Sequence, residues 1–170
     1  MKKITIVING KGGAGKDTIC NIVSKHFPSL NISSIAPIKE LAIQCGWNGE
    51  KDLKSRQFLS ELKRLLIEFN DLPTNYLLSM HQKFLSDKNL KILFVHIRES
   101  DQIEAFLKKI KGCKTTLLIK KKGLPVYSNN SDDKVEDFSY NYIYVNDKSQ
   151  EELEADFMLF FHTLLESFEE

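Results

Sequence analysis

The stretch Gly10-Lys-Gly-Gly-Ala-Gly-Lys-Asp-Thr18 decides how the rest of the chain is interpreted. It comes directly after Lys3-Ile-Thr-Ile-Val-Ile8, a β-branched run that is apolar on both faces, as expected of a buried central strand. A helical pattern follows, carried by Ile19, Ile22 and Val23. This order of strand, glycine-rich turn and helix predicts an α/β fold with the turn at the carboxyl edge of a parallel sheet.

The stretch has the spacing of a phosphate-binding P-loop, G-x-x-x-x-G-K, with Gly10, Gly15 and Lys16 in place. Glycines let the backbone curl so that successive N–H groups point inward at a phosphate, and the following helix adds its positive end. The ammonium of Lys16 can then neutralise the β- and γ-phosphate oxygens of ATP. The expected ATP-binding residues are the whole loop: Gly10, Lys11, Gly12, Gly13, Ala14, Gly15, Lys16, Asp17 and Thr18.

Asp17 departs from the general pattern, because Ser or Thr usually supplies a hydroxyl to Mg²⁺ at this position. A carboxylate is a harder, charged ligand, so Asp17 is expected to bind Mg²⁺, with Thr18 free to donate to the α-phosphate. An acidic residue is also favoured at a helix N-terminus by the helix dipole, and the two roles are compatible.

The remaining chain alternates apolar runs with helical patterns, without a repeat or a linker, which predicts one domain over residues 1–170. Further strands are expected over 30–35, 90–97, 115–119 and 142–145. Apolar stripes of period 3.6 predict helices; they comprise Phe58, Leu62, Leu65, Leu66 and Phe69, then Ile103, Phe106, Leu107 and Ile110. Ser149 and Glu152 form a capping box before a last helix with a buried face, made of Leu153, Phe157, Phe160, Phe161, Leu164 and Phe168.

The composition narrows the class of partner. The 170 residues include 24 basic and 23 acidic side chains, so the net charge of +1 gives no bulk attraction to nucleic acid or to an anionic membrane. Apolar runs such as 158–161 are far shorter than the roughly 20 residues of a membrane span. Cys20, Cys45 and Cys113 are far apart, which suits small core residues in a reducing cytoplasm rather than zinc or disulfides. The sequence is compatible with a homodimer.

The arginines indicate where an acceptor phosphate could bind, because phosphoryl transfer needs cations around the phosphate oxygens. Arg98 directly follows a buried strand, at the end where parallel sheets bind ligands, and Arg56 opens a helix. Together with Lys16 they are the expected catalytic residues, with Lys39 as a third acceptor-side cation. Arg64 lies near Glu61 and Glu68, so a surface ion pair is expected there.

The segment 120–137 lacks periodicity and is long enough for a functional lid. Its first residues, Lys120, Lys121 and Lys122, either form a solvated basic turn or cover the transferring phosphate. His81 lies on the face shared by Leu77, Met80 and Phe84, and we interpret it as structural.

Several segments resemble the deoxynucleoside monophosphate kinase family and the related phosphomevalonate kinases. Gly15-Lys-Asp-Thr18 resembles their variant P-loop, and Ser34-Ile-Ala-Pro-Ile-Lys-Glu-Leu41 is similar to their segment after the second strand. Lys54-Ser-Arg56 resembles their next basic element on the acceptor side, and His96-Ile-Arg98 stands where the family usually has Asp-x-Arg. Tyr142-Ile-Tyr-Val-Asn-Asp-Lys-Ser149 resembles the strand and loop that close over the adenine edge.

This resemblance implies a three-layer α/β/α fold whose parallel sheet of five strands has the order second, third, first, fourth, fifth, with an acceptor region over 34–72. It implies ATP- and Mg²⁺-dependent transfer of a phosphoryl group to a phosphorylated small molecule, most simply a nucleoside or deoxynucleoside monophosphate. A phosphorylated acceptor that is not a nucleotide is the alternative.

His96 supplies no carboxylate where the family's aspartate orders the hydration shell of Mg²⁺. Asp17 could take over this role, as could Asp132 or Asp133 in the lid-like segment. Otherwise the chain is a nucleotide-binding sensor or partner protein with little or no kinase activity.

Overall fold

A computed structural model describes residues 2–124 and 135–169. The strands are β1 (Ile4–Asn9), β2 (Ser29–Ser33), β3 (Ile92–His96), β4 (Cys113–Lys120) and β5 (Tyr142–Val145). The helices of these residues are α1 (Lys16–His26), α2 (Ala36–Gln44), α3 (Leu53–Asn70), α4 (Leu72–Ser86), α5 (Ser100–Lys109) and α7 (Gln150–Glu166), with a short 3-10 helix, η1 (Val135–Asp137).

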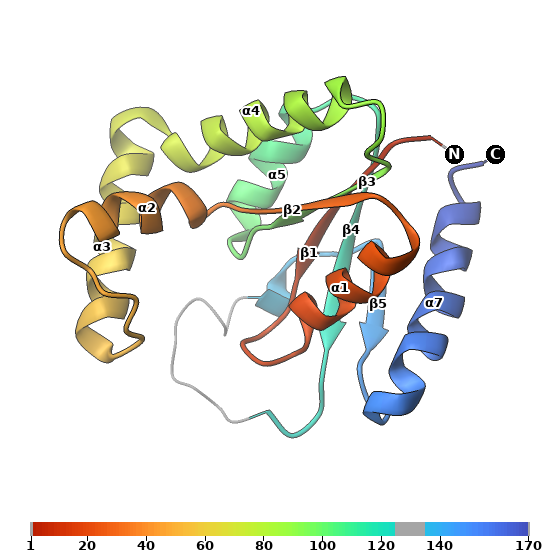
Figure 1. Cartoon of the computed structure of the whole chain (residues 1–170). Helices are drawn as coiled ribbons and strands as arrows, with labels where there is room; N and C mark the ends of the chain where they lie inside the picture. Colours follow the sequence, from red (N-terminus) through yellow and green to blue (C-terminus); the bar gives the residue numbers. More distant parts are fainter. Residues whose placement is uncertain (1, 125–134, 170) are drawn as a thin grey trace.

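The strands form one parallel sheet in the order β2-β3-β1-β4-β5 (Figure 1). The α/β class, the parallel sheet and this strand order are therefore as expected. β1 lies in the centre, with Ile8 beside His96 of β3 and Leu117 of β4. All of its residues are buried, because helices cover both faces of the sheet.

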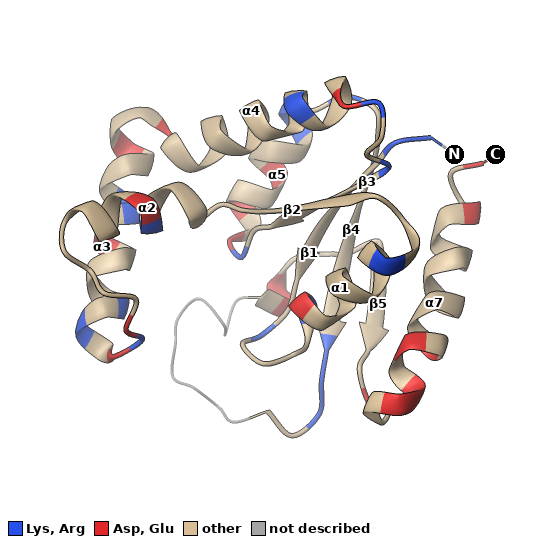
Figure 2. Cartoon of the chain, viewed as in Figure 1, with Lys and Arg blue, Asp and Glu red and all other residues tan. Residues whose placement is uncertain are grey.

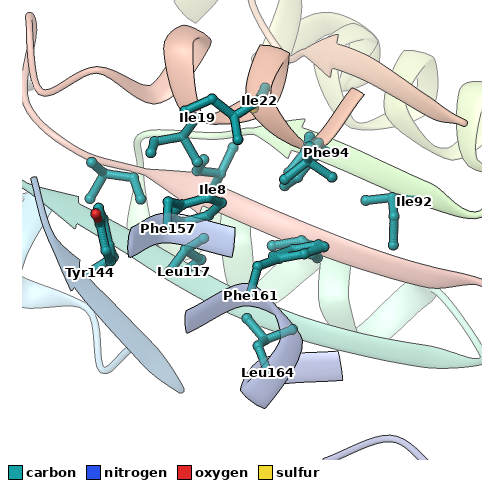
Figure 3. Packing of buried hydrophobic residues seen from close by; sticks show 14 of the residues in the cluster. Ile8, Ile19, Ile22, Ile92, Phe94, Leu117, Tyr144, Phe157, Phe161 and Leu164 are labelled. Atoms are coloured by element: carbon teal, nitrogen blue, oxygen red, sulfur yellow. The ribbon is translucent and has the colours of Figure 1, made fainter. Parts of the chain in front are cut away.

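Two apolar clusters hold the layers together. On one face, α1 and α7 pack on alternate residues of the sheet, with Ile19 of α1 and Phe157 and Phe161 of α7 fully buried (Figure 3). On the other face, Phe84 of α4 and Phe106 of α5 pack against the opposite side chains of the same strands. The result is a three-layer α/β/α arrangement that leaves the carboxyl ends of the strands for the loops.

Helices α2 and α3 form an arm beyond the carboxyl end of β2 (Figure 1). α3 has no fully buried residue, and its stripe is largely exposed: Phe69 keeps 83% of its surface and Leu65 keeps 52%. The expected helix is present, but α3 packs mainly against α2 and α4, beside the sheet rather than on it, and Lys63 of α3 pairs with Glu99 before α5 at 2.7 Å. Periodicity predicted the helix, whereas its burial depends on neighbours that periodicity does not specify.

Element boundaries differ from the expected ones by a few residues. β2 ends at Ser33 rather than at residue 35, because Ala36 and Pro37 already occupy the first positions of α2. The cysteines are all free; Cys20 is buried and Cys113 is half-buried, but Cys45 is exposed, so the expectation of a core residue is wrong for Cys45. Within the described ranges, no helix has both the length and the apolar character needed to cross a bilayer.

Candidate functional site

The glycine-rich stretch connects β1 to α1 at the carboxyl edge of the sheet. Gly13 and Gly15 have φ values of 79° and 96°, which non-glycine residues rarely adopt. Gly15 is the N-cap of α1, and the N–H of Ala14 donates to the carbonyl of Lys11 at 3.1 Å. The loop therefore curls back on itself immediately before the helix, as the motif requires.

Lys16 is the first residue of α1, and its side chain reaches back across the loop. Its Nζ donates to the carbonyls of Gly10 at 2.5 Å and of Lys11 at 3.1 Å. The ammonium thus lies beside the curled backbone, where it adds to the positive end of α1. This arrangement suits the binding of an anion that carries several oxygens.

Two buried asparagines hold the ends of the loop. The Asn9 side chain accepts from the N–H of Gly10 at 2.9 Å and donates to the hydroxyl of Tyr140 at 2.7 Å and to the carbonyl of Arg98 at 3.1 Å. Asn146, which follows β5, donates through Nδ2 to the carbonyl of Ala14 at 2.9 Å. The sequence assigned Asn9 no role, and it placed Asn146 only within the segment 142–149 that resembles the loop over the adenine edge. Their contacts to the P-loop were not predicted; the one signal was that each directly follows an apolar run, after Ile8 and Val145.

The neighbours of the loop leave no room for side chains at two glycines. A Cβ on Gly10 would lie 2.5 Å from the carbonyl oxygen of Ile119 in β4. A Cβ on Gly15 would collide with Nδ2 of Asn146. The end of β4 and the residue after β5 thus lie directly against the loop. Glycine is required at both positions because these neighbours leave no space for a Cβ.

His96 ends β3 beside the loop, with its Nε2 3.7 Å from the sulfur of Cys20 on α1. Burial lowers the pKa of His96, and the nearby charge of Asp17 opposes that shift only in part. Burial also raises the pKa of the Cys20 thiol well above its usual range, so Cys20 is a protonated, unreactive thiol. A neutral imidazole therefore stands at this strand end, next to the loop.

Glu136 forms ion pairs with two lysines, Lys11 of the P-loop and Lys120 at the end of β4. Its carboxylate accepts from Nζ of Lys120 at 2.7 Å and lies 3.6 Å from Nζ of Lys11. The hydrogen bond from Lys120 is the main reason why the pKa of Glu136 is lowered. Figure 2 shows basic residues at the end of β4 and acidic residues on the first turns of α7.

The structure says less about the other residues of the lid-like segment. Lys121 and Lys122 are exposed, and most of the lid-like segment, including Asp132 and Asp133, lies outside the described residues. Lys120 is thus the one expected lid cation that the structure, as far as it describes the chain, joins to a P-loop residue through Glu136.

The expected acceptor residues come from three places, the loop after β3, helix α2 and helix α3. Arg98 is half-buried, and its carbonyl accepts from Asn9, which holds the loop after β3 against the start of the P-loop. Arg56 is exposed and donates through Nε to the carbonyl of Lys51 at 2.9 Å, and Lys39 is exposed on α2. In the part of the chain that the structure describes, no hydrogen bond or ion pair joins Arg56 or Lys39 to the P-loop.

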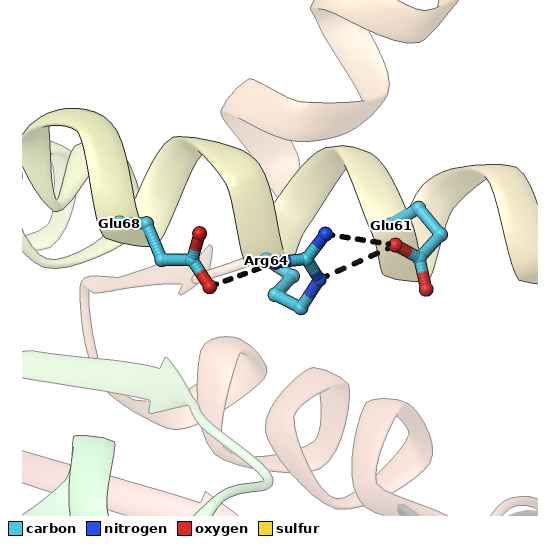
Figure 4. A network of polar contacts seen from close by, with 3 residues as sticks. All are labelled: Glu61, Arg64 and Glu68. Carbon is cyan, nitrogen blue, oxygen red and sulfur yellow. Dashed lines mark hydrogen bonds and ion pairs between the residues drawn. The ribbon is translucent and has the colours of Figure 1, made fainter.

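Arg64 forms the expected surface network on α3 (Figure 4). Its guanidinium donates to Glu68 at 2.8 Å and to Glu61 at 3.2 Å. Hydrogen bonds to Glu68, then to Glu61, raise the pKa of Arg64 above its ordinary value. The arginine is therefore engaged by two carboxylates of its own helix.

The described residues around the loop could bind a magnesium ion only together with water and phosphate oxygens, not as a site made of protein ligands alone. Among the described residues, no group of three His, Cys, Asp or Glu side chains could hold a metal ion. Mg²⁺ usually keeps several waters and binds one or two carboxylates together with phosphate oxygens. Asp17, exposed in the first turn of α1, fits that shared mode and would supply a protein carboxylate.

Comparison with models of protein families found no match, and neither did comparison with curated proteins. Among solved structures, TT1252 from Thermus thermophilus superposes with a TM-score of 0.53 over 96% of this chain and 99% of its own. The two sequences are 18% identical over this alignment. At that identity the likeness shows that the chains share a fold.

Proposed function

We propose that the chain is a small-molecule kinase that transfers the γ-phosphoryl of ATP to a phosphorylated acceptor, most simply a nucleoside or deoxynucleoside monophosphate. One observation carries the proposal: the curled loop from Gly10 to Thr18, with the Lys16 ammonium beside its carbonyls, lies at the carboxyl edge of a parallel sheet. This combination of inward backbone, helix end and lysine is suited to the triphosphate of a nucleotide.

The chemistry assigned to the loop is electrostatic, since phosphoryl transfer needs positioned positive charge more than covalent participation. Lys16 would neutralise the β- and γ-phosphates. Lys11 and Lys120 would also reach phosphate oxygens, which would compete with Glu136 for them. When bound, Mg²⁺ supplies charge that bridges β- and γ-phosphate oxygens, and Asp17 would hold it from the protein side.

The acceptor site is proposed from the resemblance and from Arg98. Arg98 follows β3 beside the loop, and its fork of donors suits a phosphate better than a lysine does. Arg56 and Lys39 would complete the site from the α2–α3 arm. A phosphorylated acceptor without a base would use the same cations, so a panel of acceptors has to separate the two kinds of substrate.

Turnover of ATP–Mg²⁺, followed as ADP release with and without a panel of nucleoside monophosphates and other phosphorylated small molecules, tests the proposal. We expect release that depends on an acceptor and saturates with it. Lys16→Ala should reduce it about 100-fold or more, because a cation on the developing charge is lost. The matched control is Lys25→Ala, at the opposite end of α1 in an exposed ion pair with Glu154, which should leave turnover unchanged. Full transfer by Lys16→Ala would refute the mechanism.

A second candidate function is a nucleotide-binding sensor with little or no turnover. His96 favours it, because burial keeps this imidazole neutral where a carboxylate would otherwise help to order a metal's waters. This candidate predicts tight binding of ATP–Mg²⁺ with no stimulation of ADP release by any acceptor in the panel.

A further inference from the structure

We propose that Asn146 is a positioning residue for phosphate: by fixing the Ala14–Gly15 peptide it aims the N–H of Gly15 at the bound phosphate. The inference rests on the proposed phosphate-binding role of the loop. It concerns a residue that lies 132 positions after the loop in the chain, at the carboxyl end of β5.

Asn146 is held rigidly, so it can act as a fixed support. Only 6% of its surface is exposed. Its backbone N–H donates to the carbonyl of Lys120 at 2.7 Å, which ties it to the last residue of β4. Three residues later, Ser149 caps α7. The side-chain amide of Asn146 is therefore placed by two strand ends and a helix start.

The amide controls the direction of one peptide of the loop. Nδ2 donates to the carbonyl of Ala14 at 2.9 Å, and this carbonyl belongs to the same peptide unit as the N–H of Gly15. No peptide bond among the described residues is cis, and in a trans peptide the C=O and N–H point in opposite directions. When the carbonyl turns toward Asn146, the N–H of Gly15 must turn away from it.

An N–H of Gly15 that points away from Asn146 is suited to bind an anion. Gly15 immediately precedes Lys16, whose ammonium crosses the loop to the carbonyls of Gly10 and Lys11. An inverted Ala14–Gly15 peptide would place a carbonyl oxygen, rather than an N–H, on the side of the loop away from Asn146. The hydrogen bond thus excludes the conformer that would repel phosphate, and the glycine at 15 leaves the room that Asn146 needs.

The first experiment measures binding of inorganic tripolyphosphate by isothermal titration calorimetry to the full chain and to Asn146→Leu. Tripolyphosphate has no base, so a loss of affinity cannot come from a contact to adenine. We expect affinity to fall about tenfold, because leucine has a similar volume but leaves the Ala14 carbonyl without its donor.

The matched control is Asn141→Leu at the other end of β5. The Asn141 side chain accepts from the N–H and hydroxyl of Thr116 in β4, at 3.2 Å and 2.9 Å, and these bonds lie at the amino end of the strand. This variant should lower the melting temperature without changing tripolyphosphate affinity. If both leucine variants bind tripolyphosphate as the unaltered chain does, Asn146 has only a structural role and the inference is wrong.

A second variant, Asn146→Asp, complements the neutral leucine variant, because at high pH it both removes the donor and adds a negative charge, and protonation reverses both changes. At pH 8 the introduced carboxylate cannot donate to Ala14, so tripolyphosphate should bind more than tenfold more weakly than to the unaltered chain. At pH 5 a carboxyl placed against a carbonyl oxygen is largely protonated and can donate again, so the ratio of affinities should shrink at least threefold. Asn146→Leu should show no such recovery, since it has no proton to gain.

Failure of this inference and failure of the proposed function are distinguishable. If the unaltered chain binds neither tripolyphosphate nor ATP–Mg²⁺, the loop does not bind phosphate and both proposals fail. If it binds both but Asn146→Asp has the same pH dependence as the unaltered chain, only the positioning role is overturned.

Discussion

Gly15 combines two demands that a side chain cannot meet, a positive φ of 96° and direct contact with Asn146. Gly46 has nearly the same φ, 93°, but open space around it. Gly46→Ala should therefore lower the free energy of unfolding by about 1–2 kcal/mol, the cost of a left-handed conformation. Gly15→Ala should cost at least about 1 kcal/mol more, because the pinned Asn146 must move.

Urea denaturation of the two variants measures this difference directly, since the backbone penalty is common to both. Equal midpoints for Gly15→Ala and Gly46→Ala would mean that Asn146 yields without cost, and the close approach would then have no energetic weight.

For single residues, the sequence predicted those contacts that form between residues close together in the chain. The loop from Gly10 to Thr18 and the pairing of Arg64 with Glu61 and Glu68 are local patterns, and the structure has both geometries. The bonds from Asn146 to Ala14 and from Asn9 to Tyr140 join residues more than 130 positions apart. No periodicity or spacing encodes such a bond, because it depends on which strands become neighbours in the sheet.

Helices α3 and α7 show why a stripe of period 3.6 does not by itself predict burial. Both carry phenylalanines at helical spacing, and the α7 stripe packs on the sheet while the α3 stripe lies beside it. The N-cap half of the expected capping box is present, with Ser149 accepting from the N–H of Glu152 at 3.3 Å, while the Glu152 carboxylate accepts from the Ser149 hydroxyl at 2.8 Å. Local signals thus predicted where both helices form, and the sheet determined which one is buried.

The same contrast predicts different costs for one substitution. Phe157 on α7 is fully buried against Tyr144, with ring centroids 4.9 Å apart, whereas Phe69 on α3 keeps 83% of its surface exposed. Phe157→Ala should lower the free energy of unfolding by about 3–5 kcal/mol through lost burial and the cavity left behind. Phe69→Ala should change it by less than about 0.5 kcal/mol.

Chemical denaturation of both variants at one temperature checks the two values. A cost for Phe69→Ala close to that for Phe157→Ala would show that the α3 stripe is covered in solution, for example by a second copy of the chain.

At the scale of the whole molecule, the alternation of apolar runs and helical patterns was enough for the α/β class, and the resemblance supplied the strand order that the structure confirms. The chemistry of the site is less fully determined. The cations expected to bind the acceptor come from α2, α3 and the loop after β3, and their meeting depends on how the arm lies against the sheet. Sequence patterns do not carry that information.

Acid should destabilise the molecule through its buried histidines. Burial lowers the pKa of His81, which is 4% exposed between Phe84 and Phe106 and whose Nε2 has no hydrogen-bond partner within residues 2–124 and 135–169. Below about pH 6.5 the unfolded chain binds a proton at this imidazole that the folded chain does not, so stability is lost as the pH falls. His96 adds to the loss in the same direction.

His81→Leu removes one of these two contributions and places an apolar side chain in an apolar site. We expect it to be neutral or mildly stabilising at pH 8, because an unpartnered buried nitrogen is removed, and increasingly stabilising relative to the unaltered chain between pH 6.5 and pH 5. The measurement is the urea midpoint of both proteins across that range. Because His96 still titrates in the variant, its acid slope should become shallower without disappearing. Parallel curves would mean that His81 takes up its proton in the folded state, through an opening of the α4–α5 layer that the packing of Phe84 and Phe106 argues against.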